Sequence, residues 1–88
     1  MAQQEQIYGE VNSKSGLEDV FLKIRKDVDE AKSRAGLTEL YRRAGYLITL
    51  THAPSWEDKF GKEASAMRRT AQDEFATTAR SINRKARE

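Results

Sequence analysis

The sequence predicts an all-α protein in which a short helical hairpin packs along one long C-terminal helix, and we expect this three-helix arrangement to form a dimeric bundle. Apolar side chains recur at intervals of three and four residues in three successive segments, which places them on one face of a helix. Proline occurs once, and apolar and charged residues make up 38% and 34% of the 88-residue chain. Such a balance is typical of a helical domain rather than of a disordered chain.

The length allows one domain with a modest core. Residues 1–14 are mostly polar, and we expect them to form a flexible N-terminal arm, because chain ends are poorly ordered unless packing holds them. Residues 15–88 then form a single helical domain. Its helices are expected at about residues 16–35, 39–52 and 55–86.

The first helix is predicted from residues 15–18, which have the form of a capping box in which Ser15 and Glu18 satisfy free backbone amides. The apolar stripe that follows contains Leu17, Val20, Phe21, Ile24, Val28, Ala31 and Ala35. Gly36 is expected to end the helix in a left-handed conformation, with Leu37 packing back on the last turn. A connection this short makes the first two helices an antiparallel hairpin.

The second helix is predicted to begin after Thr38 as its N-cap and to end near His52. Its apolar side chains cover a broad arc of the helix surface. They are Leu40, Tyr41, Ala44, Leu47 and Ile48, with Tyr46 and Leu50 to one side. A broad apolar arc indicates contact with two neighbours at once.

The third helix is predicted to begin with Ser55 as its N-cap, after Pro54, with Gly61 as the one interruption. Its apolar stripe contains Trp56, Phe60, Ala64, Met67, Ala71, Phe75, Ala79, Ile82 and Ala86. A helix of about 30 residues is roughly 45 Å long, and the first helix can cover about two-thirds of that length.

The remaining stripe needs another cover, and a second copy of the chain is the simplest one. We therefore predict a homodimer interface at Phe75, Ala79, Ile82 and Ala86. Two alternatives stay open, a frayed C-terminal end and capture by another protein or by a further segment of the chain.

The residue types argue against an enzyme and against a metal or cofactor site. The chain has no cysteine and one histidine, His52, and a lone histidine is a poor metal or acid–base site. Asp27, Asp29 and Glu30 lack the glycine and the further ligands of a calcium loop. We expect no catalytic residue, no cofactor and no metal.

The lack of cysteine and of a signal-peptide pattern predicts a cytoplasmic protein. No apolar run reaches the roughly 18 residues that cross a bilayer, and the alanine-rich, partly acidic third helix is a poor membrane-surface helix. We therefore expect no membrane association.

The predicted function is a small non-catalytic protein–protein interaction or regulatory module that acts as a helical homodimer. Leu22, Tyr46 and Leu50 fall beside the main stripes and are the predicted contacts for an unidentified protein partner. The alternative is a nucleic-acid-binding accessory protein. Residues 76–88 carry a net charge of +3, and Arg80, Arg84, Lys85 and Arg87 could contact phosphates or another anion.

Overall fold

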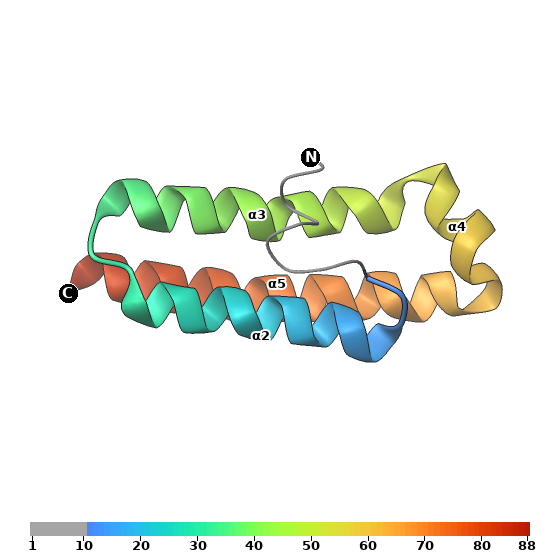
Figure 1. Cartoon of the computed structure of the whole chain (residues 1–88), viewed down its shortest axis with the longest axis horizontal. Coiled ribbons are helices and arrows are strands. Elements are labelled where there is room, and N and C mark those ends of the chain that lie inside the picture. Colours follow the sequence, from blue (N-terminus) through green and yellow to red (C-terminus); the bar gives the residue numbers. More distant parts are fainter. Residues whose placement is uncertain (1–10) are drawn as a thin grey trace.

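The computed structural model describes residues 11–88, which form helices α2 (Lys14–Glu30), α3 (Arg34–His52), α4 (Pro54–Phe60) and α5 (Ala64–Arg87). One 3-10 turn, Gly61–Glu63, joins α4 to α5. Figure 1 shows α2 and α3 lying along α5, with α2 parallel to α5 and α3 antiparallel to both. No strand occurs among the described residues. The predicted all-α class, with a hairpin packed on a long C-terminal helix, is confirmed.

Both helices of the hairpin begin at the same local motif, a serine followed three residues later by a glycine. The Ser13 hydroxyl accepts a hydrogen bond from the Gly16 amide at 2.9 Å, and the Ser33 hydroxyl accepts one from the Gly36 amide at 3.0 Å. Each serine has an extended backbone, as an N-cap residue requires. An N-cap of this kind contributes about 1 kcal/mol to helix stability.

This motif corrects the predicted boundaries of the first two helices. The turn between them covers residues 31–33, so α2 ends at Glu30 rather than near residue 35, and α3 begins at Arg34 rather than near residue 39. Gly36 lies in the first turn of α3 instead of ending the preceding helix. Ser15 likewise lies inside α2, because Ser13 caps the helix. Residues 1–10 of the predicted N-terminal arm lie outside the described residues.

The predicted single helix over residues 55–86 is also wrong, because the chain bends at Gly61. Gly61 has a φ of +57°, a backbone conformation that glycine adopts without the steric cost borne by other residues. The short helix α4 therefore lies across the end of the bundle (Figure 1). There the Trp56 ring is buried and packs on Phe60 with ring centroids 4.5 Å apart.

Arg68 joins the elements that meet at this end of the bundle. Its Nε donates a hydrogen bond to the Thr51 carbonyl in the last turn of α3 at 2.5 Å. Its Nη1 lies 3.0 Å from the Glu57 carboxylate on α4. Because one α5 side chain contacts both α3 and α4, we infer that Arg68 fixes the position of α4.

The core lies along α5, between α2 and α3. Its fully buried centre combines large apolar side chains with two threonines: Leu17, Phe21, Ile24, Val28, Met67, Thr51 and Thr78. The Thr51 hydroxyl donates to the Ile48 carbonyl at 2.8 Å, and the Thr78 hydroxyl accepts from Arg25 at 3.3 Å. Both buried hydroxyls are thus hydrogen-bonded, as burial of a polar group requires.

The hairpin covers more of α5 than the sequence predicted. Because the first turn lies at residues 31–33, α3 has 19 residues and reaches the C-terminal half of α5. Leu37, expected as a contact at the end of the first helix, is instead a buried residue of α3. The premise that the end of the α5 stripe lacks cover within one chain is therefore wrong.

Candidate functional site

The four residues of the predicted homodimer interface lie mostly against α3 of the same chain. Ile82 is 6% exposed and belongs to the core. Phe75 is half-buried and meets Tyr41 in an edge-to-face contact, with centroids 5.4 Å apart. Ala79 is half-buried and Ala86 is exposed. Of the four, Ala86 alone is exposed, and the homodimer interface stays a prediction from the sequence.

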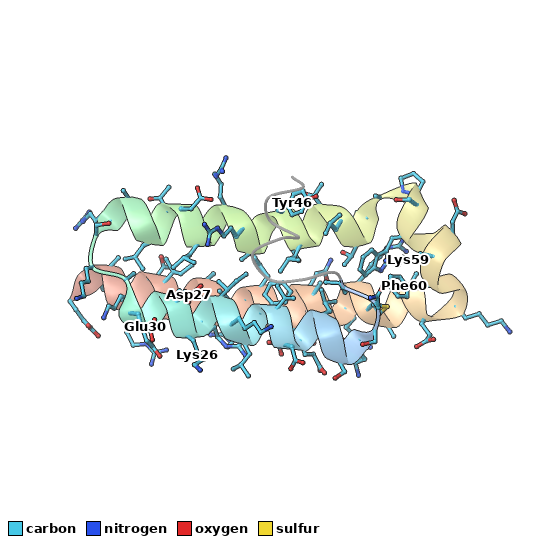
Figure 2. All side chains as sticks on the ribbon, in the orientation of Figure 1. Lys26, Asp27, Glu30, Tyr46, Lys59 and Phe60 are labelled. Atoms are coloured by element: carbon cyan, nitrogen blue, oxygen red, sulfur yellow. The ribbon has the colours of Figure 1, made fainter. Side chains whose placement is uncertain are left out.

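The three predicted partner contacts differ in exposure. Leu22 on α2 is 51% exposed. Leu50 packs partly on the core, and Tyr46 is half-buried near the middle of α3 (Figure 2). Sequence reasoning missed Tyr41, which was placed on the buried face of its helix but is 46% exposed. Leu22 is thus the best supported of the three as an apolar contact.

Arg80, Arg84 and Arg87 form one exposed strip on α5, here called the arginine ridge. They follow one another at intervals of four and three residues, so they share a helix face about 10 Å long. Together with Thr77 and Asn83 they line an open groove of about 430 Å³. Arg84 and Arg87 make no ion pair within residues 11–88. These two guanidinium groups are therefore available to an external anion.

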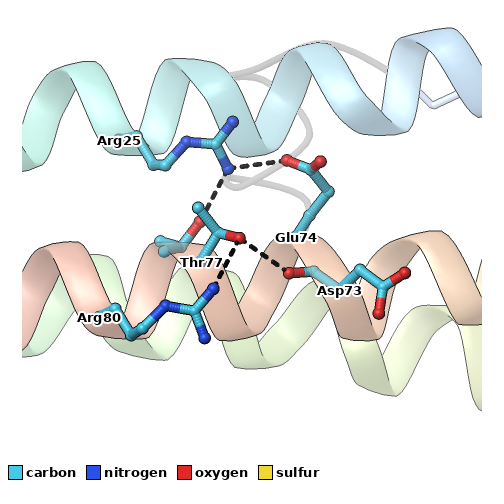
Figure 3. A network of polar contacts seen from close by, with 6 residues as sticks. Arg25, Asp73, Glu74, Thr77 and Arg80 are labelled. Carbon is cyan, nitrogen blue, oxygen red and sulfur yellow. Dashed lines mark hydrogen bonds and ion pairs between the residues drawn. The ribbon is translucent and has the colours of Figure 1, made fainter.

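Arg80 is held in place from within α5. Its Nη2 donates to the Thr77 hydroxyl at 3.3 Å, and that hydroxyl donates to the Asp73 carbonyl at 3.2 Å (Figure 3). A guanidinium has five N–H donors, so this single bond leaves Arg80 able to bind an anion. The Thr77 contact restrains the side chain along the helix surface.

Lys85, predicted with these arginines, points to the other side of α5. Its Nζ donates to the Asp29 carbonyl at 3.0 Å and lies 3.8 Å from the Glu88 carboxylate. The Asp29 carbonyl is in the last turn of α2, where a cation is favourable. The predicted anion-binding set is therefore divided between two faces, and Lys85 has a structural contact.

A second groove, here called the α2–α5 groove, lies on the side of α5 that faces α2. Its lining is mostly charged and consists of Leu22, Arg25, Lys26, Asp29, Ser81, Arg84, Lys85 and Glu88. Arg84 lines both grooves. The arginine ridge and the α2–α5 groove therefore form one continuous surface, here called the basic surface.

Arg25 crosses from α2 to α5 at the edge of this groove. Its Nη1 lies 2.7 Å from the Glu74 carboxylate and 3.3 Å from the Thr78 hydroxyl (Figure 3). About a quarter or less of the Arg25 and Glu74 side chains is exposed. We infer that Arg25 holds the two helices in register and is not mainly a ligand contact.

The paired arginines of α3 differ from those of the ridge. Glu39 accepts hydrogen bonds from Arg42 at 3.2 Å and from Arg43 at 3.3 Å. These contacts hold the pKa of the Glu39 carboxyl below its usual range. The hydrogen bond from Arg42 is the main cause, and the hydrogen bond and positive charge of Arg43 lower the pKa further. The single negative charge of Glu39 therefore offsets one of the two positive charges of Arg42 and Arg43 within α3.

The lone histidine, metal-ligand clusters and membrane-crossing helices were the other features considered from the sequence. His52 is exposed in the last turn of α3. No group of three or more histidine, cysteine, aspartate or glutamate side chains in residues 11–88 is arranged to hold a metal ion. Over the same range, no helix has the length and apolar character that a membrane crossing needs.

Comparison with known proteins gives no functional assignment. No family model, curated protein or solved structure matches the chain.

Proposed function

We propose that this protein is a small non-catalytic interaction module that binds an acidic segment of another protein through its basic surface. The observation that carries the proposal is the charge pattern of α5. Positions 75–87 contain Arg80, Arg84, Lys85 and Arg87 and no acidic residue. Three of these four cations form the exposed arginine ridge.

Helix stability alone does not account for the ridge. Cations are favourable near a helix C-terminus, but the effect falls off within the last turn. Arg84 and Arg87 lie in that turn, whereas Arg80 lies a turn earlier. Arg80 and Arg84 are like charges four residues apart, an arrangement that destabilises an isolated helix by about 0.2–0.5 kcal/mol. A bound anion would remove that repulsion.

Two features of the surface favour a protein partner. Leu22 is an exposed apolar side chain within the α2–α5 groove, and protein interfaces commonly combine an apolar contact with a polar rim. Asp29 and Glu88 line the same groove. Their carboxylates repel a phosphate backbone and can pair with a cation of a protein partner.

Nucleic acid is the alternative partner, and the ridge is the observation that favours it. Arg80, Arg84 and Arg87 follow one helix face, and the neutral hydrogen-bonding groups of Thr77 and Asn83 line the same groove. Such a strip can contact successive phosphates, and its affinity would fall steeply with salt. Homodimerisation stays a prediction from the sequence and is not needed for either function.

The test is to measure binding of fluorescent polyglutamate and of random-sequence duplex DNA at low and physiological salt. The wild type is compared with the double variant Arg80→Glu/Arg84→Glu. The matched control is Arg42→Glu/Arg43→Glu, which changes the net charge equally at the two arginines that share Glu39 on α3. The proposal expects polyglutamate to bind the wild type and the control, and to be lost with the ridge variant.

Two results would overturn this function. If polyglutamate fails to bind the wild type at low salt, the basic surface is not an acidic-protein site. If duplex DNA binds more tightly than polyglutamate and the ridge variant removes that binding, the nucleic-acid alternative replaces the proposal.

A further inference from the structure

The two walls of the α2–α5 groove carry the same order of residue types. The α2 wall reads Leu22, Arg25, Lys26 and Asp29, and the α5 wall reads Ser81, Arg84, Lys85 and Glu88. In both sets the successive residues are three, one and three positions apart, so each set lies on one face of its helix. Each wall therefore begins with a neutral residue, continues with two cations and ends with an acid.

Because α2 and α5 run parallel, the two patterns run in the same direction, with the α5 pattern displaced by about a turn or more towards the C-terminal end. Arg25 contacts Thr78. Lys85, two turns after Thr78 on α5, contacts the carbonyl of Asp29, one turn after Arg25 on α2. Residue numbers thus rise together along the two walls, and Figure 1 shows both helices running towards the same end of the bundle. The groove consequently has an apolar end at Leu22, a basic middle in which Asp29 lies beside Lys85, and an acidic end at Glu88.

The four cations of the basic middle are not equally available. Arg25 is paired with Glu74, and Lys85 is hydrogen-bonded to the end of α2. Lys26 and Arg84 make no ion pair within residues 11–88 and face the groove from opposite walls. Figure 2 shows Lys26 on the half of α2 that leads to the turn. An anion between the walls would therefore meet Lys26 and Arg84 first.

We infer that the α2–α5 groove binds an acidic peptide segment that places an apolar side chain on Leu22 and a carboxylate between Lys26 and Arg84. The inference rests on the proposed function and adds the sequence character of the partner. Leu22 and Lys26 are four residues apart on α2, about 6 Å along the helix. The two groups of the partner must have a similar separation, as residues i and i+4 of a helix do.

The acidic end of the groove sets the direction of the bound segment. The Asp29 carboxylate makes no ion pair within residues 11–88 and repels further negative charge, and Lys85 at 3.8 Å offsets only part of the charge of Glu88. A segment that is acidic along its whole length therefore fits poorly. A uniform polyphosphate chain meets the same repulsion and has no group to place on Leu22. The groove is selective for an apolar–acidic pattern, whereas the arginine ridge by itself would accept any polyanion.

The experiment uses two helical peptides of equal charge as probes. Both carry glutamates on one face, and only one has a leucine four residues before a glutamate, with alanine there in the other. Affinities for the full chain are measured by fluorescence anisotropy at two salt concentrations. We expect the leucine peptide to bind roughly tenfold more tightly, since burying a leucine side chain contributes enough free energy for that ratio.

Three variants separate the parts of the groove. Leu22→Ala should abolish the preference for the leucine peptide and leave salt-dependent binding of both. Arg84→Gln should weaken both peptides severalfold. Tyr41→Ala removes the second large apolar side chain that is exposed within residues 11–88, and it lies on α3. This variant should leave the preference unchanged. Circular dichroism confirms that each variant is folded.

The failures of the two proposals are distinguishable. If both peptides bind the wild type equally, or if Leu22→Ala keeps the leucine preference, the groove inference is overturned while the basic surface stands. If neither peptide binds at low salt, the proposed function fails and the inference fails with it.

Discussion

Replacing Ile82 with alanine tests whether this side chain is buried inside one chain or at the dimer interface that the sequence predicted. Ile82 is 6% exposed and lies between α3 and α5. Truncation of a buried isoleucine to alanine costs about 2–5 kcal/mol, and the cost rises with the cavity that remains. Ile82 also lines an open groove with Leu37 and Tyr41, so water can fill part of the space. We therefore expect a loss of about 2–3 kcal/mol, at the lower end of that range.

The matched control is Leu22→Ala, which removes the same number of carbon atoms from a side chain that is 51% exposed. Surface substitutions usually change stability by about 0.5 kcal/mol or less. For a domain of this size each kcal/mol shifts the melting temperature by about 4–8 °C. Ile82→Ala should therefore lower it by roughly 10–20 °C, and Leu22→Ala by only a few degrees.

The assay is thermal unfolding followed by circular dichroism at two protein concentrations, together with sedimentation equilibrium. If Ile82 is buried within one chain, Ile82→Ala lowers the melting temperature by the same amount at both protein concentrations. A wild-type melting temperature that rises with concentration, with a dimer that Ile82→Ala dissociates into stable folded monomers, would refute the reasoning and restore the predicted interface.

Three further predictions concern stability. Gly45→Ala should stabilise the protein by about 0.5–1 kcal/mol, because alanine favours the helix more than glycine does and the added Cβ meets no atom within 4 Å. The expected readout is a higher urea midpoint, and a lower midpoint would contradict the prediction. Arg68→Met should lower the free energy of unfolding by about 1–2 kcal/mol and speed amide hydrogen exchange in α4, because Arg68 bonds Thr51 and Glu57. The same substitution at the exposed neighbouring residue, Arg69→Met, should do neither. Glu39→Gln should lower the urea midpoint near neutral pH, because Arg42 holds the pKa of Glu39 below its unfolded value. The stability difference between the wild type and Glu39→Gln is fully present above the unfolded pKa of Glu39 and disappears as pH falls through its folded pKa. It should also weaken with salt. A stability difference that is the same at all pH values would exclude the ion pair as its cause.

The candidate surface was predictable in part. Arg80, Arg84 and Arg87 are spaced by helical turns in a basic segment, so their common face follows from the sequence. The contact of Lys85 with the end of α2 does not, because it depends on how two helices distant in the sequence are aligned. For the same reason the sequence indicated Leu22 as an exposed side chain but not the groove that surrounds it.

The helix boundaries illustrate a local limit of sequence reasoning. A glycine is compatible with either end of a helix, and Gly36 was assigned to the wrong one. The repeated serine-x-x-glycine spacing at Ser13 and Ser33 was the signal that could have corrected it. Gly61 is the opposite case, since its backbone conformation ends α4 where the apolar spacing alone predicted a continuous helix.

The sequence by itself determined the all-α class and most of the buried face of each helix, because a period of three to four residues selects both at once. Only the tertiary structure decided what covers the end of α5. A shift of the first turn by a few residues lengthened α3 and moved Leu37 into the core, and this buried Ile82 within one chain. The length of a neighbouring helix, which local periodicity does not set, determines whether an apolar stripe is internal or an interface.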